Sequence, residues 1–375
     1  MIKRFYQNLQ KYIQKGKALI IYGPRRVGKT TLLKQFLSLS KEKYRFDTGD
    51  NIRLQSTLGS LDFKKIADYV NNFDLIVIDE AQKIPKIGET LKIIADQYPD
   101  KAIIATGSSS FELAGQVGEP LTGRKRTLKL FPVAQLELLE NSNSYDLKNS
   151  LDQYLIYGSY PSILSISDEI GKRRLLNELI DSYLLKDILE FENIKGAKVL
   201  LDLLRLLAYQ VGSEVSTTEL GRQLGIDYKT ILRYLDLFEK SFVLFSLRGY
   251  SRNLRKEVSK MSKYYFYDNG IRNAVISNFN ELNIRNDIGQ LWENFIIAER
   301  IKKQSYQEFY CNNYFWRTWD KKEIDWIEER EGKLYGYEFK WDGKNEVFAP
   351  KDWVNAYDNT EFDVINSDNY LEFIT

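Results

Sequence analysis

The chain has 375 residues, which at roughly 100–200 residues per domain indicates two or three globular domains. Hydrophobic residues make up 43% of the sequence and charged residues 28%, and this composition excludes a disordered, collagen-like or membrane-embedded chain. The 54 basic residues nearly balance the 52 acidic residues, and the net charge is +2. Any affinity for nucleic acid must therefore come from local basic patches.

The sequence contains no histidine and one cysteine, Cys311. Histidine-dependent nucleophile pairs, histidine zinc sites and imidazole acid–base chemistry are excluded, as is an intrachain disulfide. Any catalysis must use carboxylates, lysine, hydroxyl groups or a metal ion. The single cysteine fits a reducing compartment, so we expect a cytoplasmic protein.

The first seventeen or so residues carry Phe5, Leu9, Tyr12 and Ile13 at helical spacing, which predicts an amphipathic helix and not a signal peptide. The longest uncharged stretch of interest, residues 153–167, is too short and too polar to cross a bilayer. We therefore expect no association with a membrane.

Short apolar runs alternate with helical patterns in the first 133 residues. The runs at 18–22, 75–78 and 102–106 are continuously apolar, which is typical of strands that are buried on both faces of a parallel sheet. The intervening segments, such as 29–38 and 87–97, have helical spacing. This series predicts an α/β domain over residues 1–133.

A glycine-rich motif, G-x-x-x-x-G-K-T, follows the first predicted strand and opens the first long helix. In this context the loop is expected to wrap its backbone N–H groups around the phosphates of ATP. Lys29 would reach the β- and γ-phosphates, and the Thr30 hydroxyl would bind Mg²⁺. The residues expected to bind the nucleotide here are Gly23, Pro24, Arg25, Arg26, Val27, Gly28, Lys29, Thr30 and Thr31.

Two acidic residues end the next apolar strand, at the sheet edge where nucleotides bind. Asp79 is expected to hold Mg²⁺, and Glu80 is expected to polarise the attacking water. The following strand ends in hydroxyl residues, of which Thr106 or Ser108 could contact the γ-phosphate or that water; a helix cap is an equally good role for them. Arg124, which precedes a strand predicted at 127–131, is the candidate cation for the transition state, on its own subunit or on a neighbour.

Residues 134–196 are mostly helical in pattern and predict a lid or linker. Residues 197–250 then read as three helices followed by a β-hairpin, which is the pattern of a winged helix. Ser216 and Glu219 form a capping box, Gly225 ends the short helix and Asp227 caps the next.

The third of these helices, at about 228–240, stands in the recognition position of a helix-turn-helix, so Lys229, Thr230 and Arg233 are expected to contact double-stranded DNA. Residues 248–263 carry six basic residues against one acid, which suggests a phosphate-binding surface. A structural joint or a protein-binding module is an alternative role for this segment.

The last segment, 251–375, carries carboxylates in an ordered series. Glu293 lies on a predicted helix at 289–302, Asp325 on an alternating strand, and Glu338 and Lys340 on one face of the next strand. This set looks like the PD-(D/E)xK set of nucleases, in which Asp325 and Glu338 would hold Mg²⁺, Glu293 would support the metal and Lys340 would position the attacking water. An ordinary exposed hairpin is the alternative.

The combination of GPRRVGKTTLL, LIVIDEAQKIP, IATGSSSFEL and GRKRTLKLFP resembles the prokaryotic AAA+-like ATPases that carry a winged helix and a C-terminal domain of unknown function. Later blocks match as well, including YYFYDNGIRN, LWENF and FWRTWDKKEIDWI. The resemblance implies ATP binding, a winged helix and a small C-terminal α/β domain similar to restriction endonucleases.

The sequence therefore predicts a P-loop NTPase sheet, a helical linker, a winged helix and a nuclease-like domain. The predicted function is ATP hydrolysis that depends on Mg²⁺ and is linked to DNA. The alternative is an ATP-gated switch that binds protein or DNA and has a catalytically silent C-terminal domain.

Overall fold

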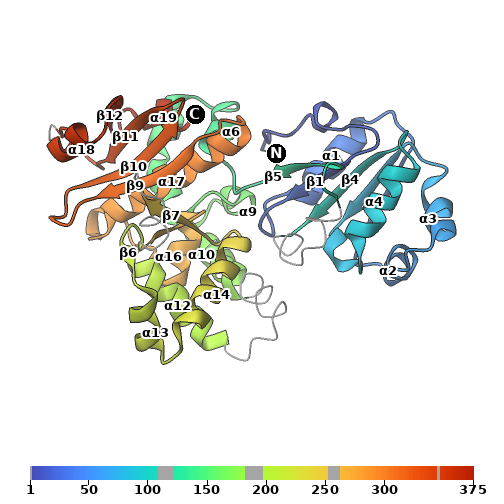
Figure 1. Cartoon of the computed structure of the whole chain (residues 1–375), viewed down its shortest axis with the longest axis horizontal. Helices are drawn as coiled ribbons and strands as arrows, with labels where there is room; N and C mark the ends of the chain where they lie inside the picture. Colours follow the sequence, from blue (N-terminus) through green and yellow to red (C-terminus); the bar gives the residue numbers. More distant parts are fainter. Residues whose placement is uncertain (1, 109–120, 182–196, 252–261, 344–346) are drawn as a thin grey trace. The chain divides into compact units, whose positions relative to one another are not determined.

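The computed structural model describes residues 2–108, 121–181, 197–251, 262–343 and 347–375 (Figure 1). The chain divides into two compact units. The N-terminal unit comprises Lys3–Pro132 with the short segment Lys240–Phe242, and the C-terminal unit comprises Val133–Glu239 with Val243–Thr375. The two long parts meet at Pro132 and Val133, next to the predicted boundary after residue 133.

The N-terminal unit is built on a five-stranded parallel sheet with the strand order β2-β3-β4-β1-β5. Its strands are β1 (Ala18–Tyr22), β2 (Tyr44–Thr48), β3 (Leu75–Asp79), β4 (Ala102–Gly107) and β5 (Lys125–Lys129). The three central strands are buried at every position, which agrees with their continuously apolar sequences. The edge strand β2 is half-exposed and more polar.

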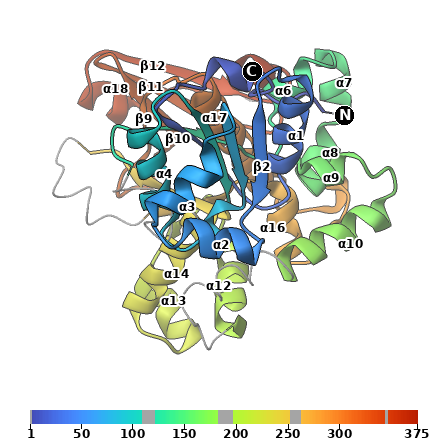
Figure 2. The same ribbon diagram turned by 90° about the vertical axis from the view of Figure 1, so that its right-hand side faces the viewer.

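Helices cover both faces of this sheet (Figures 1 and 2). They are α1 (Lys29–Leu39), α2 (Ile52–Leu58), α3 (Phe63–Val70) and α4 (Ile87–Gln97), with short 3₁₀ turns η1 (Leu9–Lys11) and η2 (Ala81–Lys83). The connection from β1 to β2 crosses the sheet in the opposite direction to the connections that follow. Because such crossovers are right-handed, α1 packs on one face while α3 and α4 pack on the other.

The segment before β1 differs from the amphipathic helix that its spacing predicts. Only Leu9–Lys11 forms a helical turn there. The Tyr6 ring instead packs edge-on against Phe5 and Tyr12, with ring centroids 5.5 and 5.3 Å apart. These aromatic contacts take the place of the predicted helical stripe.

The C-terminal unit contains a seven-stranded sheet with the order β12-β11-β10-β9-β7-β8-β6. Its strands are β6 (Glu214–Val215), β7 (Leu244–Gly249), β8 (Ser262–Phe266), β9 (Asn312–Arg317), β10 (Glu323–Arg330), β11 (Lys333–Phe339) and β12 (Thr360–Ile365). One core cluster of this unit centres on Trp353, Trp316 and Ile327, which are buried between β9, β10 and α18 (Lys351–Ala356).

Helices make up the rest of the C-terminal unit. Those before β6 are α6 (Gln135–Leu139), α7 (Ser144–Asn149), α8 (Leu151–Tyr157), α9 (Pro161–Leu164), α10 (Glu169–Leu179) and α12 (Ala197–Tyr209). Those after β6 are α13 (Thr217–Leu224), α14 (Tyr228–Lys240), α16 (Asn269–Val275), η4 (Leu282–Ile284), α17 (Ile288–Tyr306), α18 and α19 (Tyr370–Ile374). Ser216 caps α13, as predicted, and Gly225 ends it in a left-handed conformation.

The predicted boundary after residue 250 is not observed. Strand β7 pairs with β8 on one edge and, in parallel, with β9 on the other, where Arg248 lies beside Tyr314 and Gly249 beside Phe315. The second edge of β7 would otherwise present unpaired N–H and C=O groups, and β9 satisfies them. The hairpin that follows α14 therefore belongs to the same sheet as the last four strands.

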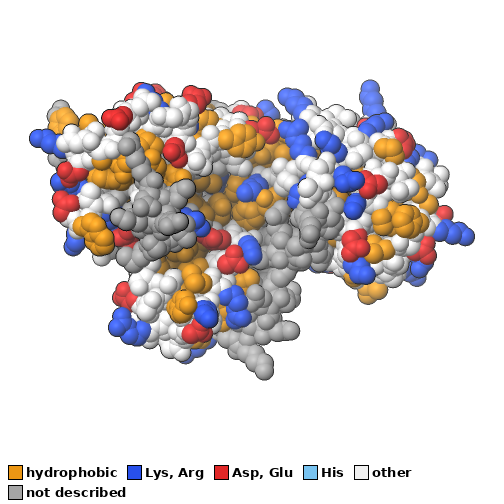
Figure 3. All heavy atoms as spheres, viewed as in Figure 1, with side chains coloured by type: hydrophobic (Ala, Val, Ile, Leu, Met, Phe, Trp, Pro, Cys, Tyr) orange, Lys and Arg blue, Asp and Glu red, His pale blue; other side chains and the backbone are white. Residues whose placement is uncertain are grey.

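The described helices include none that is long and apolar enough to cross a membrane. Basic and acidic side chains are interspersed over the face of the molecule in Figure 3, where no broad field of one sign is seen. This distribution agrees with the near balance of charges in the sequence.

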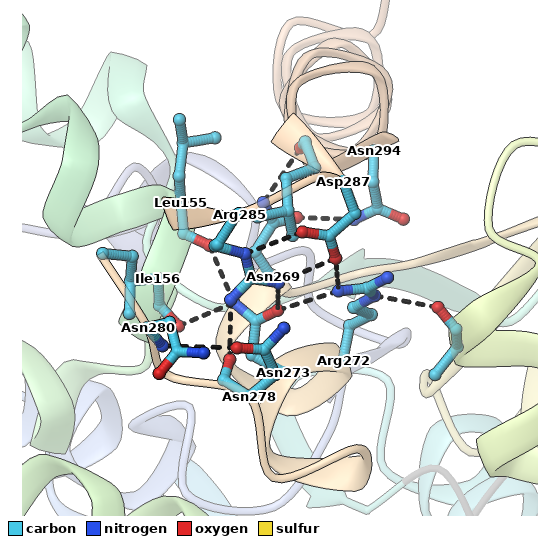
Figure 4. Close-up of polar contacts among 12 residues, drawn as sticks. Leu155, Ile156, Asn269, Arg272, Asn273, Asn278, Asn280, Arg285, Asp287 and Asn294 are labelled. Carbon is cyan, nitrogen blue, oxygen red and sulfur yellow. Dashed lines mark hydrogen bonds and ion pairs between the residues drawn. The ribbon is translucent and has the colours of Figure 1, made fainter. Parts of the chain in front are cut away.

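The block YYFYDNGIRN forms a buried polar hub at the start of α16 (Figure 4). Asp287 accepts hydrogen bonds from the guanidinium of Arg272 at 2.5 Å and from two nitrogens of Arg285 at 2.8 Å. Both arginines also donate to the side-chain oxygen of Asn273, at 3.1 and 3.0 Å. All these groups are buried or nearly so, and each compensates the desolvation of the others.

The hub reaches four neighbouring elements. Asn273 donates to two carbonyls of α8 at 3.0 and 2.9 Å, and Arg272 donates to Ala208 O in α12 at 2.9 Å. Asn294 of α17 donates to Phe266 O of β8 at 3.0 Å. These bonds join the helical segment, the three-helix segment and the large sheet, so we assign this sequence block a structural role.

Candidate functional site

The glycine-rich loop leaves β1 and enters α1. Gly23 has a φ of 157°, and a Cβ at this position would lie 1.9 Å from the carbonyl oxygen of Leu130, so only glycine fits. Gly28, the N-cap residue of α1, has a φ of 96° and carries no side chain that could cap the helix. The start of α1 therefore receives no side-chain cap from Gly28, and a helix N-terminus favours an anion.

Lys29 is buried, and its ammonium group folds back onto the loop. It donates to the carbonyl oxygens of Gly23 at 2.8 Å and Pro24 at 2.9 Å. The positive charge is thus held inside the turn of the loop, at the end of α1 whose dipole also favours an anion.

Asp79 joins the loop to the end of the central strands. Its carboxylate accepts a hydrogen bond from the Thr30 hydroxyl at 2.6 Å and a second one from the Thr106 hydroxyl. Thr106 in turn accepts from the backbone N–H of Glu80 at 3.2 Å. The structure therefore brings together Thr30, Asp79 and one of the two hydroxyl residues that sequence reasoning left open.

Glu80 follows β3 in a left-handed conformation, with a φ of 49°. Its carboxylate accepts a hydrogen bond from the side-chain amide of Gln82 at 2.7 Å, and the same amide donates to the Ser108 hydroxyl at 3.1 Å. Gln82 thus fixes the side chains of Glu80 and Ser108 relative to each other. Sequence reasoning missed Gln82, because a glutamine in a short turn carries no motif.

A second residue that sequence reasoning missed is Arg4, which is buried. Its guanidinium donates to the carbonyl oxygen of Val27 in the loop and to that of Phe131 at 2.7 Å. The segment before β1 is therefore tied to the back of the loop. No local pattern indicates these contacts, because the partners lie 23 and 127 residues away in the chain.

The other predicted loop residues differ in exposure. Pro24 and Val27 are buried, so they can act on a ligand only through their backbone. Arg25 and Arg26 are half-buried, and Thr31 is exposed on the first turn of α1.

Arg124 does not lie at this site within its own chain. Strands β1 and β5 are parallel, with Ala18 beside Lys125 and Tyr22 beside Lys129. Arg124 therefore lies at the start of the sheet, while the glycine-rich loop follows its end, about 20 Å farther along the strands. Its guanidinium pairs with Asp96. Its predicted role on the nucleotide of its own subunit is wrong, because a residue that precedes a parallel strand projects from the opposite edge.

The residues around the loop fit a nucleotide-bound magnesium ion. Mg²⁺ typically keeps several waters and takes one or two protein ligands together with phosphate oxygens. Thr30 and Asp79 supply such a pair, and the other oxygen of the Asp79 carboxylate accepts a hydrogen bond from Thr106. Among the described residues, no group of three or more Asp, Glu, His or Cys side chains could hold a metal ion.

The N-terminal half of α14 carries the residues predicted to contact DNA. The side chain of Asp227 caps the helix by accepting from the backbone N–H groups of Lys229 at 2.9 Å and Thr230 at 3.1 Å. The Thr230 hydroxyl also donates to Asp227 at 2.6 Å. Lys229 and Arg233 are exposed and lie one turn apart. Thr230 is thus part of the cap, whereas the two basic side chains point outward.

The basic stretch 248–263 is only partly described, because residues 252–261 lie outside the described ranges. Of its two described basic residues, Arg248 is exposed but Lys263 is only 2% exposed. The interpretation of Lys263 as part of a phosphate-binding surface is wrong. In strand β8 its side chain points into the sheet's covered face.

The predicted C-terminal carboxylates lie on α17, β10 and β11, which are neighbours in Figure 1. Trp326 of β10 pairs with Tyr337 of β11, so the adjacent residues Asp325 and Glu338 lie close together. Asp325 accepts from the backbone N–H of Phe339 at 2.9 Å, and Lys340 donates to Glu338 at 2.7 Å. The elements follow the order α17-β9-β10-β11-α18-β12, which includes the helix and the two strands predicted to carry the carboxylates.

Burial dominates the electrostatics of this cluster. It raises the pKa of the Asp325 carboxyl well above its usual range, and the nearby carboxylates of Glu293 and Glu338 raise it further. Burial also raises the pKa of Glu293, against the opposing effects of Lys263 and a hydrogen bond from Tyr265.

The cluster contains an additional lysine. The ammonium of Lys263 pairs with Glu323 and lies 3.7 Å from Glu293, and the hydroxyl of Tyr265 donates to Glu293 at 2.6 Å. With this cation among the carboxylates, the residues present do not fit a divalent metal ion. The structure accordingly has no metal-holding group of three such side chains within its described ranges.

Comparison with known proteins divides the chain into three parts. Residues 15–139 match a family model described as an AAA domain. Residues 148–282 and 288–367 match two models that are each described as a domain of unknown function.

Relatives over most of the chain are uncharacterized proteins. One from Mycobacterium tuberculosis is 25% identical over 340 residues, which cover 88% of this chain and 72% of that protein. One from Haemophilus influenzae is 25% identical over 363 residues, which cover 89% of this chain and 85% of that protein. One from Methanocaldococcus jannaschii is 25% identical over 337 residues and covers 85% and 73%.

Among solved structures, a Walker-type ATPase of Pyrococcus abyssi aligns with a TM-score of 0.47 at 16% identity and covers 69% of this chain and 91% of that protein. The AMPPCP-bound DnaA of Aquifex aeolicus aligns with a TM-score of 0.27 at 18% identity, over 63% and 84%. The assignment depends instead on the family match at residues 15–139 and on the parallel sheet with its glycine-rich loop. The N-terminal unit therefore has the α/β fold of a P-loop NTPase, and its residues 15–139 match an AAA domain.

Proposed function

We propose that the protein binds ATP with Mg²⁺ and hydrolyses it at the end of strands β1, β3 and β4. The observation that carries this proposal is the Asp79 carboxylate, which is held by the hydroxyls of Thr30 and Thr106 beside the glycine-rich loop. Bound Mg²⁺ would offset negative charge on the phosphates as they react. Thr30 and Asp79 would hold the metal, and Lys29 would turn its ammonium from the loop carbonyls to the phosphates.

Glu80 is the proposed residue that orients the attacking water. Its carboxylate lies at the same sheet edge, and Gln82 holds it beside Ser108. Exchange of the carboxylate for an amide of the same shape would leave ATP binding intact while removing the acceptor for the proton of the water.

The test is steady-state phosphate release by the wild-type protein and by Glu80→Gln. We expect a fall in kcat of about 10²–10⁴-fold, the usual contribution of a positioned general base. ATP affinity should change little. Equal rates for the two proteins would contradict the proposed role of Glu80.

We also propose that α14 contacts double-stranded DNA through a winged helix. The elements follow the order α12-β6-α13-α14-β7-β8, and β8 pairs in an antiparallel fashion with both β6 and β7. This order places α14 third among the helices, where a recognition helix stands. The exposed side chains of Lys229 and Arg233 near its start support this proposal.

Binding to a labelled DNA duplex tests the second proposal. Lys229→Ala and Arg233→Ala should each weaken binding and reduce the slope of log affinity against log salt by about 1. Lys351→Ala, a change of an exposed lysine on α18, is the matched control and should have no effect. If all three variants bind DNA like the wild type, α14 does not contact it.

The ATP hydrolysis rate with and without duplex DNA distinguishes an ATPase from a switch. Stimulation by DNA would link the two proposed activities. Slow hydrolysis at an unchanged rate would favour the ATP-gated regulator instead.

A further inference from the structure

Lys263 is the buried cation of the C-terminal carboxylate cluster. It lies on β8 and is only 2% exposed. Its ammonium pairs with Glu323, lies 3.7 Å from Glu293 Oε1 and stands over the ring of Phe315 at 5.2 Å from the centroid. Burial alone would lower the pKa of Lys263, but the carboxylates of Glu293, Glu323 and Asp325 raise it.

Three of the four carboxyl groups around this ammonium have a cationic partner without any metal ion. Four carboxyl groups come from α17, β10 and β11, namely Glu293, Glu323, Asp325 and Glu338. Lys263 lies among them and Lys340 donates to Glu338 at 2.7 Å, whereas Arg317 lies 3.8 Å from Glu323 and pairs more closely with Glu214, at 3.0 Å. A divalent ion added to this arrangement would face the repulsion of a buried positive charge.

Two of the carboxylates also accept hydrogen bonds from neighbouring groups of the protein. Asp325 accepts a backbone N–H from Phe339 at 2.9 Å, and Glu293 accepts the hydroxyl of Tyr265 at 2.6 Å. Gly212, in the turn between α12 and β6, comes so close to Glu293 that a Cβ there would lie 2.9 Å from its carboxylate oxygen. Lys263 and Tyr265 therefore bind strand β8 to the carboxylates of α17 and β10, and the turn at Gly212 packs closely against Glu293.

We propose that the ammonium of Lys263 takes the place of a divalent metal ion in this cluster, so that the C-terminal sheet binds no metal and does not cleave nucleic acid. The cluster instead fastens strand β8 to α17 and β10. Removal of the lysine leaves the carboxylates with an excess of negative charge. A divalent cation then binds among them, in the position of the missing ammonium.

Titration of the nucleotide-free full chain with Mn²⁺, followed by the electron paramagnetic resonance signal of the free ion, tests the proposal. The wild type and the Asp325→Asn variant should bind the same amount of Mn²⁺. Lys263→Met should bind one additional ion per chain, and the double variant Lys263→Met/Asp325→Asn should lose it. Asp79 is present in all four proteins, so any ion that binds near it does not affect the differences between them.

Thermal unfolding with and without Mn²⁺ covers the case in which Lys263→Met folds poorly. Mn²⁺ should then raise the unfolding midpoint of Lys263→Met, or restore its folded state, and leave the wild type unchanged. A wild-type Mn²⁺ site that disappears in Asp325→Asn would overturn the proposal. So would a Lys263→Met variant that gains neither Mn²⁺ binding nor stability.

Incubation of duplex DNA with Mn²⁺ provides a separate readout. Wild-type protein should produce no more cleavage than Asp325→Asn or Lys340→Ala. Cleavage by the wild type that both variants lose would also overturn the proposal.

Discussion

The hydroxyl of Thr30 offers a quantitative test of the nucleotide site, because Thr30→Val removes it while keeping the shape of the side chain. In the structure the hydroxyl donates to Asp79 at 2.6 Å. In the nucleotide-bound protein the oxygen of this hydroxyl would instead contact Mg²⁺, and a polar contact with a charged group contributes about 1.5–3 kcal/mol, by comparison with hydrogen bonds to charged groups. In the variant Asp79 still accepts a hydrogen bond from Thr106, so its carboxylate is not left without a donor. The lower part of this range therefore applies.

A loss of about 1.5–2 kcal/mol corresponds to about a 10- to 30-fold weaker affinity, at about 1.4 kcal/mol for each factor of ten. We expect this loss only for ATP with Mg²⁺, since Thr30 acts on the phosphates through the metal. In EDTA the variant and the wild type should bind ATP equally. Thr30→Ser, which keeps the hydroxyl, is the matched control and should bind like the wild type.

Isothermal titration calorimetry with Mg²⁺ and with EDTA measures both affinities. Thermal unfolding of the nucleotide-free proteins shows whether each variant is folded. The reasoning fails if Thr30→Val binds Mg²⁺-ATP as tightly as the wild type, or if its affinity falls equally in EDTA.

The remaining predictions concern two other residues. Arg124→Ala should leave the hydrolysis rate of the dilute protein unchanged, because Arg124 lies at the opposite end of its own sheet; a role on a neighbouring subunit would instead appear as a loss that grows with protein concentration. Asp287→Asn should destabilise the fold by about 3–5 kcal/mol in chemical unfolding, since Arg272 and Arg285 lose their buried partner. Burial alone would raise the pKa of Asp287, but the two arginines lower it, so the wild type should lose this stabilisation as the pH falls below about 4. The variant should show a smaller loss over that acid range.

Much of the N-terminal sheet could be predicted from the sequence because its central strands are buried on both faces. A continuous apolar run has few other interpretations there, and β1, β3 and β4 lie within one residue of the predicted ranges. Strand β2 was missed because it lies at an edge of the sheet. Its sequence, Tyr-Arg-Phe-Asp-Thr, contains half-exposed polar residues and therefore lacks the continuous apolar run of the central strands.

The site itself was predictable only where a motif fixes the chemistry. Lys29, Thr30 and Asp79 follow from a loop sequence and from a strand that ends in carboxylates. Arg4 and Gln82 could not be found in this way, because their roles depend on contacts with residues distant in the chain.

The C-terminal half shows the same limit for domains. The order of helices and strands was predictable, but the pairing of β7 with β9 was not. Strands pair through backbone hydrogen bonds, and the side-chain pattern of a strand does not indicate its partner. Lys263 was misread for a related reason. Its neighbours in the sequence are basic, whereas its neighbours in the structure are carboxylates.

The most direct test of the ATP site is nucleotide binding by Lys29→Ala. Lys29 is buried in the glycine-rich loop, where its ammonium contacts the carbonyls of Gly23 and Pro24. Lys34→Ala, a change of an exposed lysine on the same helix, is the control. Calorimetry should show ATP binding by the wild type and by Lys34→Ala and none by Lys29→Ala. A wild-type protein that does not bind ATP, or a Lys29→Ala variant that binds it equally well, would contradict the assignment.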